Sequence, residues 1–401
     1  MINKMDNTSL YVHVPFCRRR CGYCDFNTYA HQEHRISDYI TALIGEAKQV
    51  CQSADQPIPI HTMFFGGGTP SLIPIGEMER LVNCFSSLFV LQPDIEMTLE
   101  ANPGTVSLEY LISLRKLGFN RLSLGMQSAH PDDLHILSRE HEITDVIHAI
   151  EWARRAGFDN LNLDLIFGIP YQPLDRWKNT LEFTSSLSVE HLSLYSLIVE
   201  PNTPLFHWVE EGLLNAPDDD LAADMYEFAM EYLDREGFVQ YEISNWARKN
   251  QEIGYRSCCH NLQYWYNLPY IGLGAGAHGY AGGVRTANIR GIAGYIRRLK
   301  DGEGGLYPIT AAAQNIIRVG KNQEMNETMM VGLRLVDEGV DDASFHDRFG
   351  VNMIDVFKPK IDKLIRLGLL EWKPDQPDHL RLTHRGRLLG NQVFVEFIEE
   401  D

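Results

Sequence analysis

Residues 11–26 read Tyr11-Val-His-Val-Pro-Phe-Cys17-Arg-Arg-Arg-Cys21-Gly-Tyr-Cys24-Asp-Phe26. The short apolar run from Leu10 to Val14 predicts a strand, and Pro15 ends this strand and begins a loop. The loop holds three cysteines in the spacing C-x3-C-x2-C. Three cysteines so close in the sequence predict a metal site.

Three thiolate ligands leave a coordination position open. Four would close a zinc or iron-sulfur site, whereas three leave one iron of a [4Fe-4S] cluster without a protein ligand. The motif resembles that of the radical S-adenosylmethionine superfamily, in which the methionine end of the cofactor chelates the free iron. The resemblance implies that the reduced cluster cleaves the cofactor to an adenosyl radical. The alternative is a zinc site whose fourth ligand is Cys258, Cys259 or His260.

Composition restricts the class of protein. A chain of 401 residues, with 44% hydrophobic and 22% charged residues, is typical of a soluble globular protein with two domains. The formal net charge of -18 argues against nucleic acid as a partner. The one dense basic cluster, Arg18 to Arg20, flanks the thiols, so we expect it to lower the cysteine pKa or to meet an acidic partner.

The cysteines and the polar start bear on location. Seven cysteines is an odd number, and three lie in one loop, which fits a reducing compartment better than a disulfide framework. Residues Met1 to Ser9 lack the apolar core of a signal peptide, and no window approaches the length of a membrane span. We therefore expect a cytoplasmic protein.

Strands and helices alternate as far as residue 200. Apolar patterns predict strands at 10–14, 62–65, 96–101, 121–125, 161–167 and 191–199, with helices between them at 36–51, 77–89, 107–117, 144–156 and 174–187. Six strands joined through helices imply parallel βαβ units, and right-handed crossovers curve such units into a partial (βα)6, TIM-like barrel. We therefore predict an α/β fold of the radical S-adenosylmethionine type, with its site at the carboxyl ends of the strands.

The second half of the chain has a different pattern. We predict three parts, namely a partial barrel over 1–215, a barrel-associated segment over 216–310 and a helical, winged-helix-like domain over 311–401. Residues 254–283 are predicted to be rich in loops. In the last part, helices at 326–335, 341–349 and 353–367 precede a hairpin at 369–383. The helix at 353–367 is only mildly basic, which favours a protein-contact or lid role over DNA binding.

Polar residues follow the predicted strand ends. The run Gly66-Gly67-Gly68-Thr69-Pro70 lets the backbone approach a ligand closely. Glu100, Gln127, Arg139 and Asp164 lie at or just past later strand ends. Together they supply carboxylates for hydroxyl and ammonium groups, an amide, and a guanidinium for a carboxylate. Each alone is explained as well by a capping or solvated side chain, so the prediction depends on the set.

The order of these motifs resembles the oxygen-independent coproporphyrinogen III oxidase family of dehydrogenases, which has a branch of heme chaperones. The resemblance covers most of the chain and extends through Asp164-Leu-Ile-Phe-Gly-Ile-Pro170. It implies that Cys17, Cys21 and Cys24 hold a [4Fe-4S] cluster. It also implies that eight residues contact S-adenosylmethionine: Tyr11, Gly67, Gly68, Thr69, Glu100, Gln127, Arg139 and Asp164.

Three features favour the heme chaperone branch. The dehydrogenases carry a fourth cysteine two positions after the third, where this chain has Phe26. They also carry an N-terminal extension, whereas only ten residues precede Tyr11 here. His260-Asn-Leu-Gln-Tyr264-Trp265 matches the H-N-x-x-Y-W signature of the chaperones. An imidazole beside aromatic rings can ligate heme iron, so we predict that His260 lies in the heme site; a core histidine beside packing aromatics is the alternative.

The resemblance then implies a chaperone that binds heme as cargo and delivers it to acceptor hemoproteins, including membrane-bound respiratory subunits. It further implies a homodimer and peripheral contact with the membrane. The alternatives are the dehydrogenase, an enzyme that decarboxylates two propionates of coproporphyrinogen III, and a radical enzyme with another substrate; we assign no catalytic residue. The run Gly272-Leu-Gly274-Ala-Gly-Ala277 fits the dinucleotide pattern G-x-G-x-x-A without a βαβ unit around it, and we predict a tight loop there.

Overall fold

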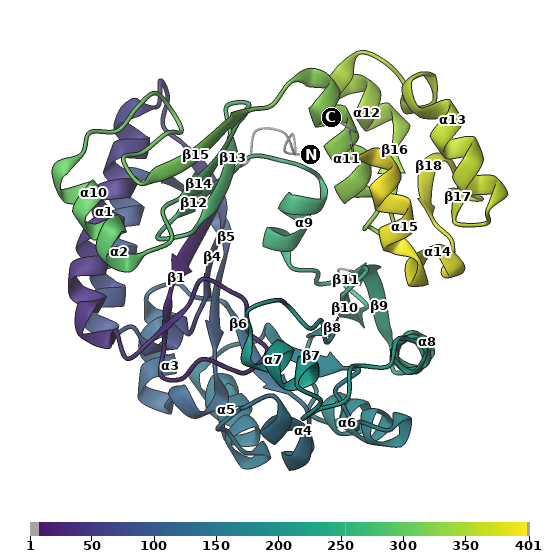
Figure 1. Cartoon of the computed structure of the whole chain (residues 1–401). Helices are drawn as coiled ribbons and strands as arrows, with labels where there is room; N and C mark the ends of the chain where they lie inside the picture. The colour runs from purple at the N-terminus through teal and green to yellow at the C-terminus, as the bar shows by residue number, and fades with distance from the viewer. Residues whose placement is uncertain (1–7, 253, 399–401) are drawn as a thin grey trace. The chain divides into compact units, whose positions relative to one another are not determined.

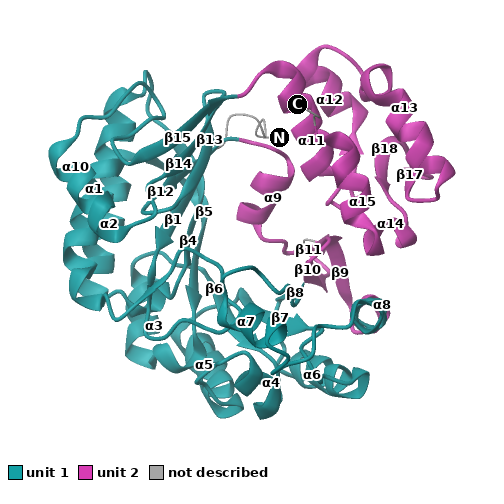
Figure 2. Cartoon of the chain, in the orientation of Figure 1, with its two compact units in different colours: residues 1–229, 269–318 teal, residues 230–268, 319–401 magenta. Residues whose placement is uncertain are grey.

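The computed structural model describes residues 8–252 and 254–398, so most of the polar start from Met1 to Ser9 lies outside the described residues. The chain divides into two compact units (Figure 2). Unit 1 comprises residues 1–229 and 269–318, and unit 2 comprises residues 230–268 and 319–401. This division follows contacts in space, and the three predicted ranges 1–215, 216–310 and 311–401 remain a prediction.

Unit 1 is built on a parallel sheet whose first six strands pair in chain order. The strands are β1 Thr8–Val14, β4 Pro59–Gly67, β5 Val90–Ala101, β6 Arg121–Gln127, β7 Leu161–Phe167 and β8 His191–Ser196. The helices between them, which lie along the outer face of the curved sheet (Figure 1), are α1 Ile36–Ser53, α2 Ile75–Leu88, α3 Leu108–Lys116, α5 Ile143–Ala156 and α6 Leu174–Ser186. The predicted α/β fold with a partial barrel is confirmed.

Alternation along the strands separates the packed face from the inner face. In β6 all seven residues are buried. Leu122, Leu124 and Met126 alternate with polar or small residues, and the two sets point to opposite faces of the sheet. The same alternation in β7 places Asp164 on the opposite face from Leu163 and Leu165. The barrel interior therefore receives the polar side chains of both strands.

The segment 254–283 differs from its prediction. We expected loops, but it contains α9 Cys259–Trp265 in unit 2 and, in unit 1, β12 Tyr270–Leu273 and β13 His278–Ala281. β12 pairs in parallel with β1 and so extends the sheet beyond its first strand. From β12, antiparallel pairing continues through β13 and β14 Val284–Asn288 to β15 Ala313–Arg318. The prediction was wrong because its glycines mark a close approach of the paired strands β12 and β13, where a Cβ on Gly272 would overlap the carbonyl group of His278.

The glycine loop after β12 packs closely against β1 and against the segment that holds the cysteines. A Cβ on Gly274 would overlap the carbonyl oxygen of His13, and one on Gly276 would overlap the side chain of Asn27. Asn27 also donates a hydrogen bond of 2.9 Å to the carbonyl oxygen of Ala275. The dinucleotide-like pattern therefore reflects close backbone packing, as we predicted for a tight loop.

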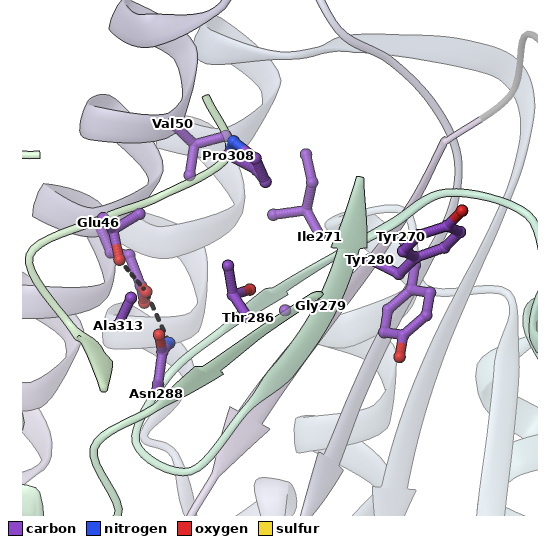
Figure 3. Close-up of a pocket in the computed structure, with 12 residues that line it drawn as sticks. Glu46, Val50, Tyr270, Ile271, Gly279, Tyr280, Thr286, Asn288, Pro308 and Ala313 are labelled. Atoms are coloured by element: carbon purple, nitrogen blue, oxygen red, sulfur yellow. Dashed lines mark hydrogen bonds between the residues drawn. The ribbon is translucent and has the colours of Figure 1, made fainter. Parts of the chain in front are cut away.

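A buried carboxylate joins α1 to this segment (Figure 3). Glu46 is fully buried and accepts hydrogen bonds from the amide of Gly274 (2.8 Å), from Asn288 (2.7 Å) and from Tyr295 in α10 Ile292–Asp301 (2.5 Å). Burial raises its pKa to about 7 although these bonds oppose the shift. The adjoining cavity measures about 10 Å³, which is room for about one water. This arrangement is a structural joint of the fold.

Unit 2 combines a small hairpin with the predicted helical region. The hairpin is formed by β9 Phe238–Glu242 and β10 Asn245–Asn250. The predicted helical region contains α11 Lys321–Gly332, β16 Val340–Asp341, α12 Asp342–Phe349, α13 Met353–Arg366, β17 Leu370–Lys373, β18 Gln376–Leu382, α14 His384–Leu388 and α15 Gly390–Phe394. They pack around a core that includes Met329, Phe345 and Ile361. The helices followed by a hairpin agree with the prediction. Within the described residues, no helix is both long and apolar enough to cross a membrane.

Candidate cofactor site

One cavity in unit 1, with a volume of about 370 Å³, collects nearly all the residues predicted for the cluster and S-adenosylmethionine. It lies where β4 to β8 end, as parallel strands with a partial barrel predict. Tyr11 does not line it. The predicted residues that do are Cys17, Cys21, Cys24, Gly67, Gly68, Thr69, Glu100, Gln127, Arg139 and Asp164.

The three cysteines are free thiols that face this cavity. Burial raises the pKa of Cys17 to about 11 and also raises the pKa of Cys24. The expectation that the arginine cluster lowers the cysteine pKa is therefore wrong for these two residues. Arg20 does lower the pKa of Cys24, but desolvation has the larger effect. Such thiols need a positive metal centre to become thiolates.

The spacing of the thiols bears on the zinc alternative. A zinc ion with Zn–S bonds of about 2.3 Å needs sulfur atoms within about 4.6 Å of one another. Among residues 8–252 and 254–398, one group of three candidate ligands has all donor atoms within 4.8 Å, and it contains none of these cysteines. The zinc candidates Cys258, Cys259 and His260 belong to unit 2. The three thiols therefore do not lie as close together here as the ligands of one zinc ion would.

A polar chain runs from one cysteine to another along the cavity wall. Thr69 donates to the sulfur of Cys17 (3.6 Å), and Asn102 donates to the hydroxyl oxygen of Thr69 (3.3 Å). Arg139 donates to the side-chain oxygen of Asn102 (2.6 Å) and to the sulfur of Cys21 (3.6 Å). Asn102 was not among the predicted site residues. Its signal was its position in Glu100-Ala-Asn-Pro, directly after a strand end.

Two half-buried carboxylates face the same cavity. Glu100 accepts a hydrogen bond of 3.1 Å from the amide of Gly67. Burial, and then the nearby Asp164, raise the pKa of Glu100 to about 8. Burial also raises the pKa of Asp164. A pair of carboxylates removed from water favours a ligand that carries positive charge and hydroxyl groups.

Tyr11 and Gln127 hold special positions. The hydroxyl of Tyr11 lies 2.9 Å from Nδ1 of His13, and the Tyr11 ring stacks on Phe64 at 6.4 Å between centroids. Tyr11 therefore supports the strand below the cavity. Gln127 lines the cavity at the end of β6 with φ of 67°, a left-handed conformation that is uncommon outside glycine.

The comparisons with known proteins agree with this geometry. The radical SAM superfamily pattern matches residues 11–184, and the HemN C-terminal domain matches residues 319–389. The heme chaperone HemW of Bacillus subtilis (strain 168) is 37% identical over 393 residues, covering 98% of this chain and 99% of that protein. The chain belongs to the HemW heme chaperone family. The HemW protein of Escherichia coli (strain K12) is 34% identical and covers 99% of this chain and 100% of its own length.

A solved structure shows the shared fold of the HemW family and the oxidases. Coproporphyrinogen III oxidase (HemN) from Escherichia coli, a radical SAM enzyme, matches with a TM-score of 0.82 at 23% identity. The match covers 98% of this chain and 90% of that chain. At this identity it establishes the fold, and the family assignment comes from the HemW relatives.

The residue that separates this HemW chain from the dehydrogenase motif also lines the cavity. Phe26 is 62% exposed, and Ile198 and Tyr195 line the same cavity with 65% and 44% exposure. Tyr195 and Ile198 were missed in the sequence because the end of β8 has no polar motif to mark it. These exposed apolar side chains line the cavity together with the exposed charged residues Arg19, Arg20 and Asp25.

His260, the predicted heme residue, lies in α9 of unit 2. It is 2% exposed, and its Nε2 lies 2.9 Å from the hydroxyl of Tyr264. The two rings meet edge to face with centroids 5.1 Å apart. In this position the imidazole is already engaged, and its role in heme binding stays a prediction.

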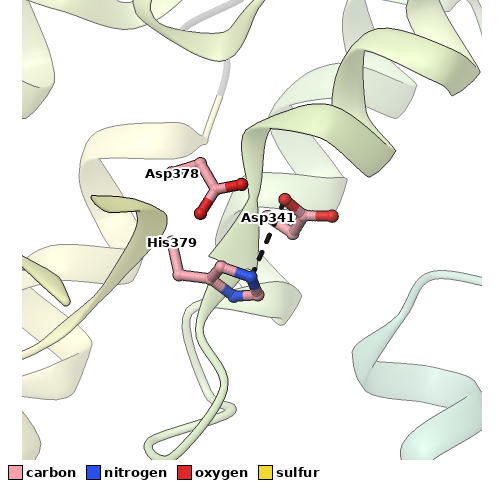
Figure 4. A group of neighbouring side chains, drawn as sticks. All are labelled: Asp341, Asp378 and His379. Atoms are coloured by element: carbon pink, nitrogen blue, oxygen red, sulfur yellow. Dashed lines mark ion pairs between the residues drawn. The ribbon is translucent and has the colours of Figure 1, made fainter. Parts of the chain in front are cut away.

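A second cluster of potential metal ligands lies in unit 2 (Figure 4). Donor atoms of Asp341, Asp378 and His379 are all within 4.8 Å of one another. Asp341, however, caps α12 by accepting hydrogen bonds from the amides of Ala343 (3.1 Å) and Ser344 (3.0 Å). Its other neighbour is His379, at 3.8 Å. A helix cap with an ion pair accounts for this cluster without a metal.

Proposed function

We propose that this HemW family member holds a [4Fe-4S] cluster on Cys17, Cys21 and Cys24, binds S-adenosylmethionine, and carries heme to acceptor hemoproteins. The observation that carries the proposal is the similarity to proteins named heme chaperones, which are 37% and 34% identical to this chain over nearly its whole length. The chemistry of the cavity supports the cofactor part, because three thiols, a guanidinium and two half-buried carboxylates line one space.

Each set of residues has a distinct task in this proposal. Cys17, Cys21 and Cys24 hold the cluster. The hydrogen bonds that Thr69 and Arg139 donate to two of their sulfurs adjust its reduction potential. The guanidinium of Arg139 receives the carboxylate end of S-adenosylmethionine beside the glycine run, while Glu100 and Asp164 accept from its ammonium and hydroxyl groups. Bound together, the cluster and S-adenosylmethionine supply radical chemistry.

The cargo and partner parts of the proposal rest on the family. His260 is the proposed heme residue, and release of its Nε2 from Tyr264 would free a nitrogen for iron. The acceptors we propose are hemoproteins, including membrane-bound respiratory subunits, served by a homodimer of this chain in peripheral contact with the membrane. No nucleic acid takes part, in keeping with the net charge of -18.

A heme-transfer experiment tests this function. The anaerobically reconstituted protein is loaded with heme and mixed with an apo-hemoprotein, and transfer is followed by the absorption spectrum. We expect transfer by the full-length protein and a loss of heme binding in His260→Ala. The matched control is His346→Ala, an exposed histidine of the same unit. Heme binding by His260→Ala with unchanged spectrum and affinity would overturn the assignment of His260, and absence of transfer by the wild type would overturn the chaperone function.

A further inference from the structure

A buried chain of hydrogen bonds runs beneath the cofactor cavity across three strands. Its centre is Asn162 of β7, which is 1% exposed and does not line the cavity. The side-chain oxygen of Asn162 lies 2.6 Å from Nδ1 of His191 and 3.1 Å from the hydroxyl of Ser193, both on β8. Its amide nitrogen donates to the hydroxyl of Ser123 on β6 (2.7 Å) and to Asp164 (2.9 Å).

The direction of these bonds is fixed by the chemistry of the groups. Ser123 accepts from Asn162 and donates its own hydroxyl to the second oxygen of Asp164 at 3.0 Å. A side-chain amide donates only through nitrogen and accepts only through oxygen. Asn162 therefore directs its oxygen toward His191 and Ser193, and its nitrogen toward Ser123 and Asp164. Both oxygens of Asp164 therefore accept a hydrogen bond from below, which favours the ionised carboxylate.

The charges around Asp164 come from several elements. Burial raises its pKa, whereas Asn162, Ser123, the buried Arg121 and Ser193 lower it. His191 is fully buried, and burial and Arg121 hold its pKa well below its usual value, so it stays neutral. The remaining groups that interact with Asp164 are Glu100 of β5, Tyr23 of the cysteine loop and Arg139. The hydrogen bonds thus oppose desolvation.

We propose that Asn162, both directly and through Ser123, is a positioning residue that holds Asp164 as an acceptor-only carboxylate directed at the cavity. Asp164 and Ser123 line the cavity, so the remaining lone pairs of the carboxylate are available to a ligand with hydroxyl or ammonium groups. This inference rests on the proposed binding of S-adenosylmethionine. It adds that a residue out of reach of the ligand sets the affinity for it.

The competing explanation is that the chain only satisfies buried polar groups and fixes the register of β6, β7 and β8. The two explanations differ in their response to pH. If Asn162 keeps Asp164 ionised, its loss weakens binding most at low pH, and the defect shrinks as rising pH ionises Asp164 again. A purely structural role gives a defect of constant size.

The test measures binding of S-adenosylmethionine to the reconstituted full-length protein by equilibrium dialysis from pH 6.5 to 8.5. The variants are Asn162→Leu and Ser123→Ala, with Ser123→Thr as the conservative rescue. Thr98→Val, a buried hydroxyl on β5 that does not line the cavity, is the matched control. Asp164→Asn is the reference variant, because it has no carboxylate that a rise in pH could ionise.

We expect Asn162→Leu and Ser123→Ala to bind about tenfold more weakly than the wild type at pH 6.5 and to approach it at pH 8.5. Ser123→Thr and Thr98→Val should follow the wild type. If Asn162→Leu does not fold, Ser123→Ala carries the test alone. Wild-type affinity at all pH values, or a defect of the same size at all of them, overturns the inference. A wild type that binds no S-adenosylmethionine instead overturns the proposed function on which it rests.

Discussion

At the scale of single residues, the cavity combines groups that burial pushes toward their neutral forms. The thiol of Cys17 and the carboxyl of Glu100 both have a raised pKa because they are desolvated. A positively charged metal centre at the thiols and a cationic ligand at the carboxyls would reverse that tendency, since each favours the ionised form of its partner. The proposed cofactors therefore match the charges that these groups can develop.

The titration of Glu100 yields the first prediction. Its pKa of about 8 lies above the ordinary value of 4.5, so a ligand that needs the carboxylate must displace a proton at neutral pH. Affinity for S-adenosylmethionine should therefore rise as pH increases from 6.5 to 8.5, and Glu100→Gln should flatten this rise. Dialysis against labelled cofactor measures both. A pH profile that Glu100→Gln leaves unaltered would contradict the assignment.

Arg139 yields a second prediction, because its guanidinium serves three partners at once. It bonds Asn102, the carbonyl oxygen of Gly125 (2.8 Å) and the sulfur of Cys21. A lysine cannot reproduce this fork, so Arg139→Lys should lower cofactor affinity about tenfold while iron content is kept. Arg19→Lys, with a side chain 61% exposed, is the control. Equal affinities of the two variants would show that the fork is dispensable.

The sequence predicted residues of the cavity that lie in or after a strand. It missed residues that become neighbours only through the pairing of strands. Glu100 was found because it lies near the end of β5, and Asp164 because it is a carboxylate within the predicted strand Leu161–Phe167. Ser123 and Asn162 were not, since they become neighbours through the pairing of β6 with β7, and a single sequence does not reveal which positions face each other. His260 was found through its motif, and its role still awaits a test.

At the scale of elements, apolar periodicity was a reliable guide where strands are buried on both faces. β7 has the predicted bounds, Leu161–Phe167, because its leucines alternate with polar residues and the strand ends before a glycine. β12 was missed because it contains Gly272, and glycine is a residue that ordinary strands rarely contain. Here the glycine permits a close approach of β12 and β13 that only the tertiary fold requires.

The joint between α1 and the segment after β12 gives a prediction at this scale. Removal of the Glu46 carboxylate leaves the donors of Asn288, Tyr295 and Gly274 buried without their acceptor. Glu46→Ala should lower the free energy of unfolding by about 3 kcal/mol. Urea denaturation measures this, with the exposed Glu79→Ala on α2 as the control. A loss no greater than that of the control would mean that the joint is not stabilising.

At the scale of the whole molecule, the cavity leads us to expect radical chemistry, whereas the family assignment leads us to expect heme delivery. The cavity has the residues of a radical S-adenosylmethionine protein. The near full-length relatives are named heme chaperones, and Phe26 stands two positions after Cys24, where the resemblance to the dehydrogenases predicts a fourth cysteine. Radical machinery in this chain therefore does not by itself imply the chemistry of the oxidase that shares its fold.

The most direct test of the central claim compares two activities in one anaerobic preparation. The cluster is reconstituted, and heme binding and transfer are measured beside turnover of coproporphyrinogen III with S-adenosylmethionine and a reductant. We predict stoichiometric heme binding, transfer to an apo-hemoprotein and no protoporphyrinogen. Formation of protoporphyrinogen at catalytic rates, without heme transfer, would contradict the account.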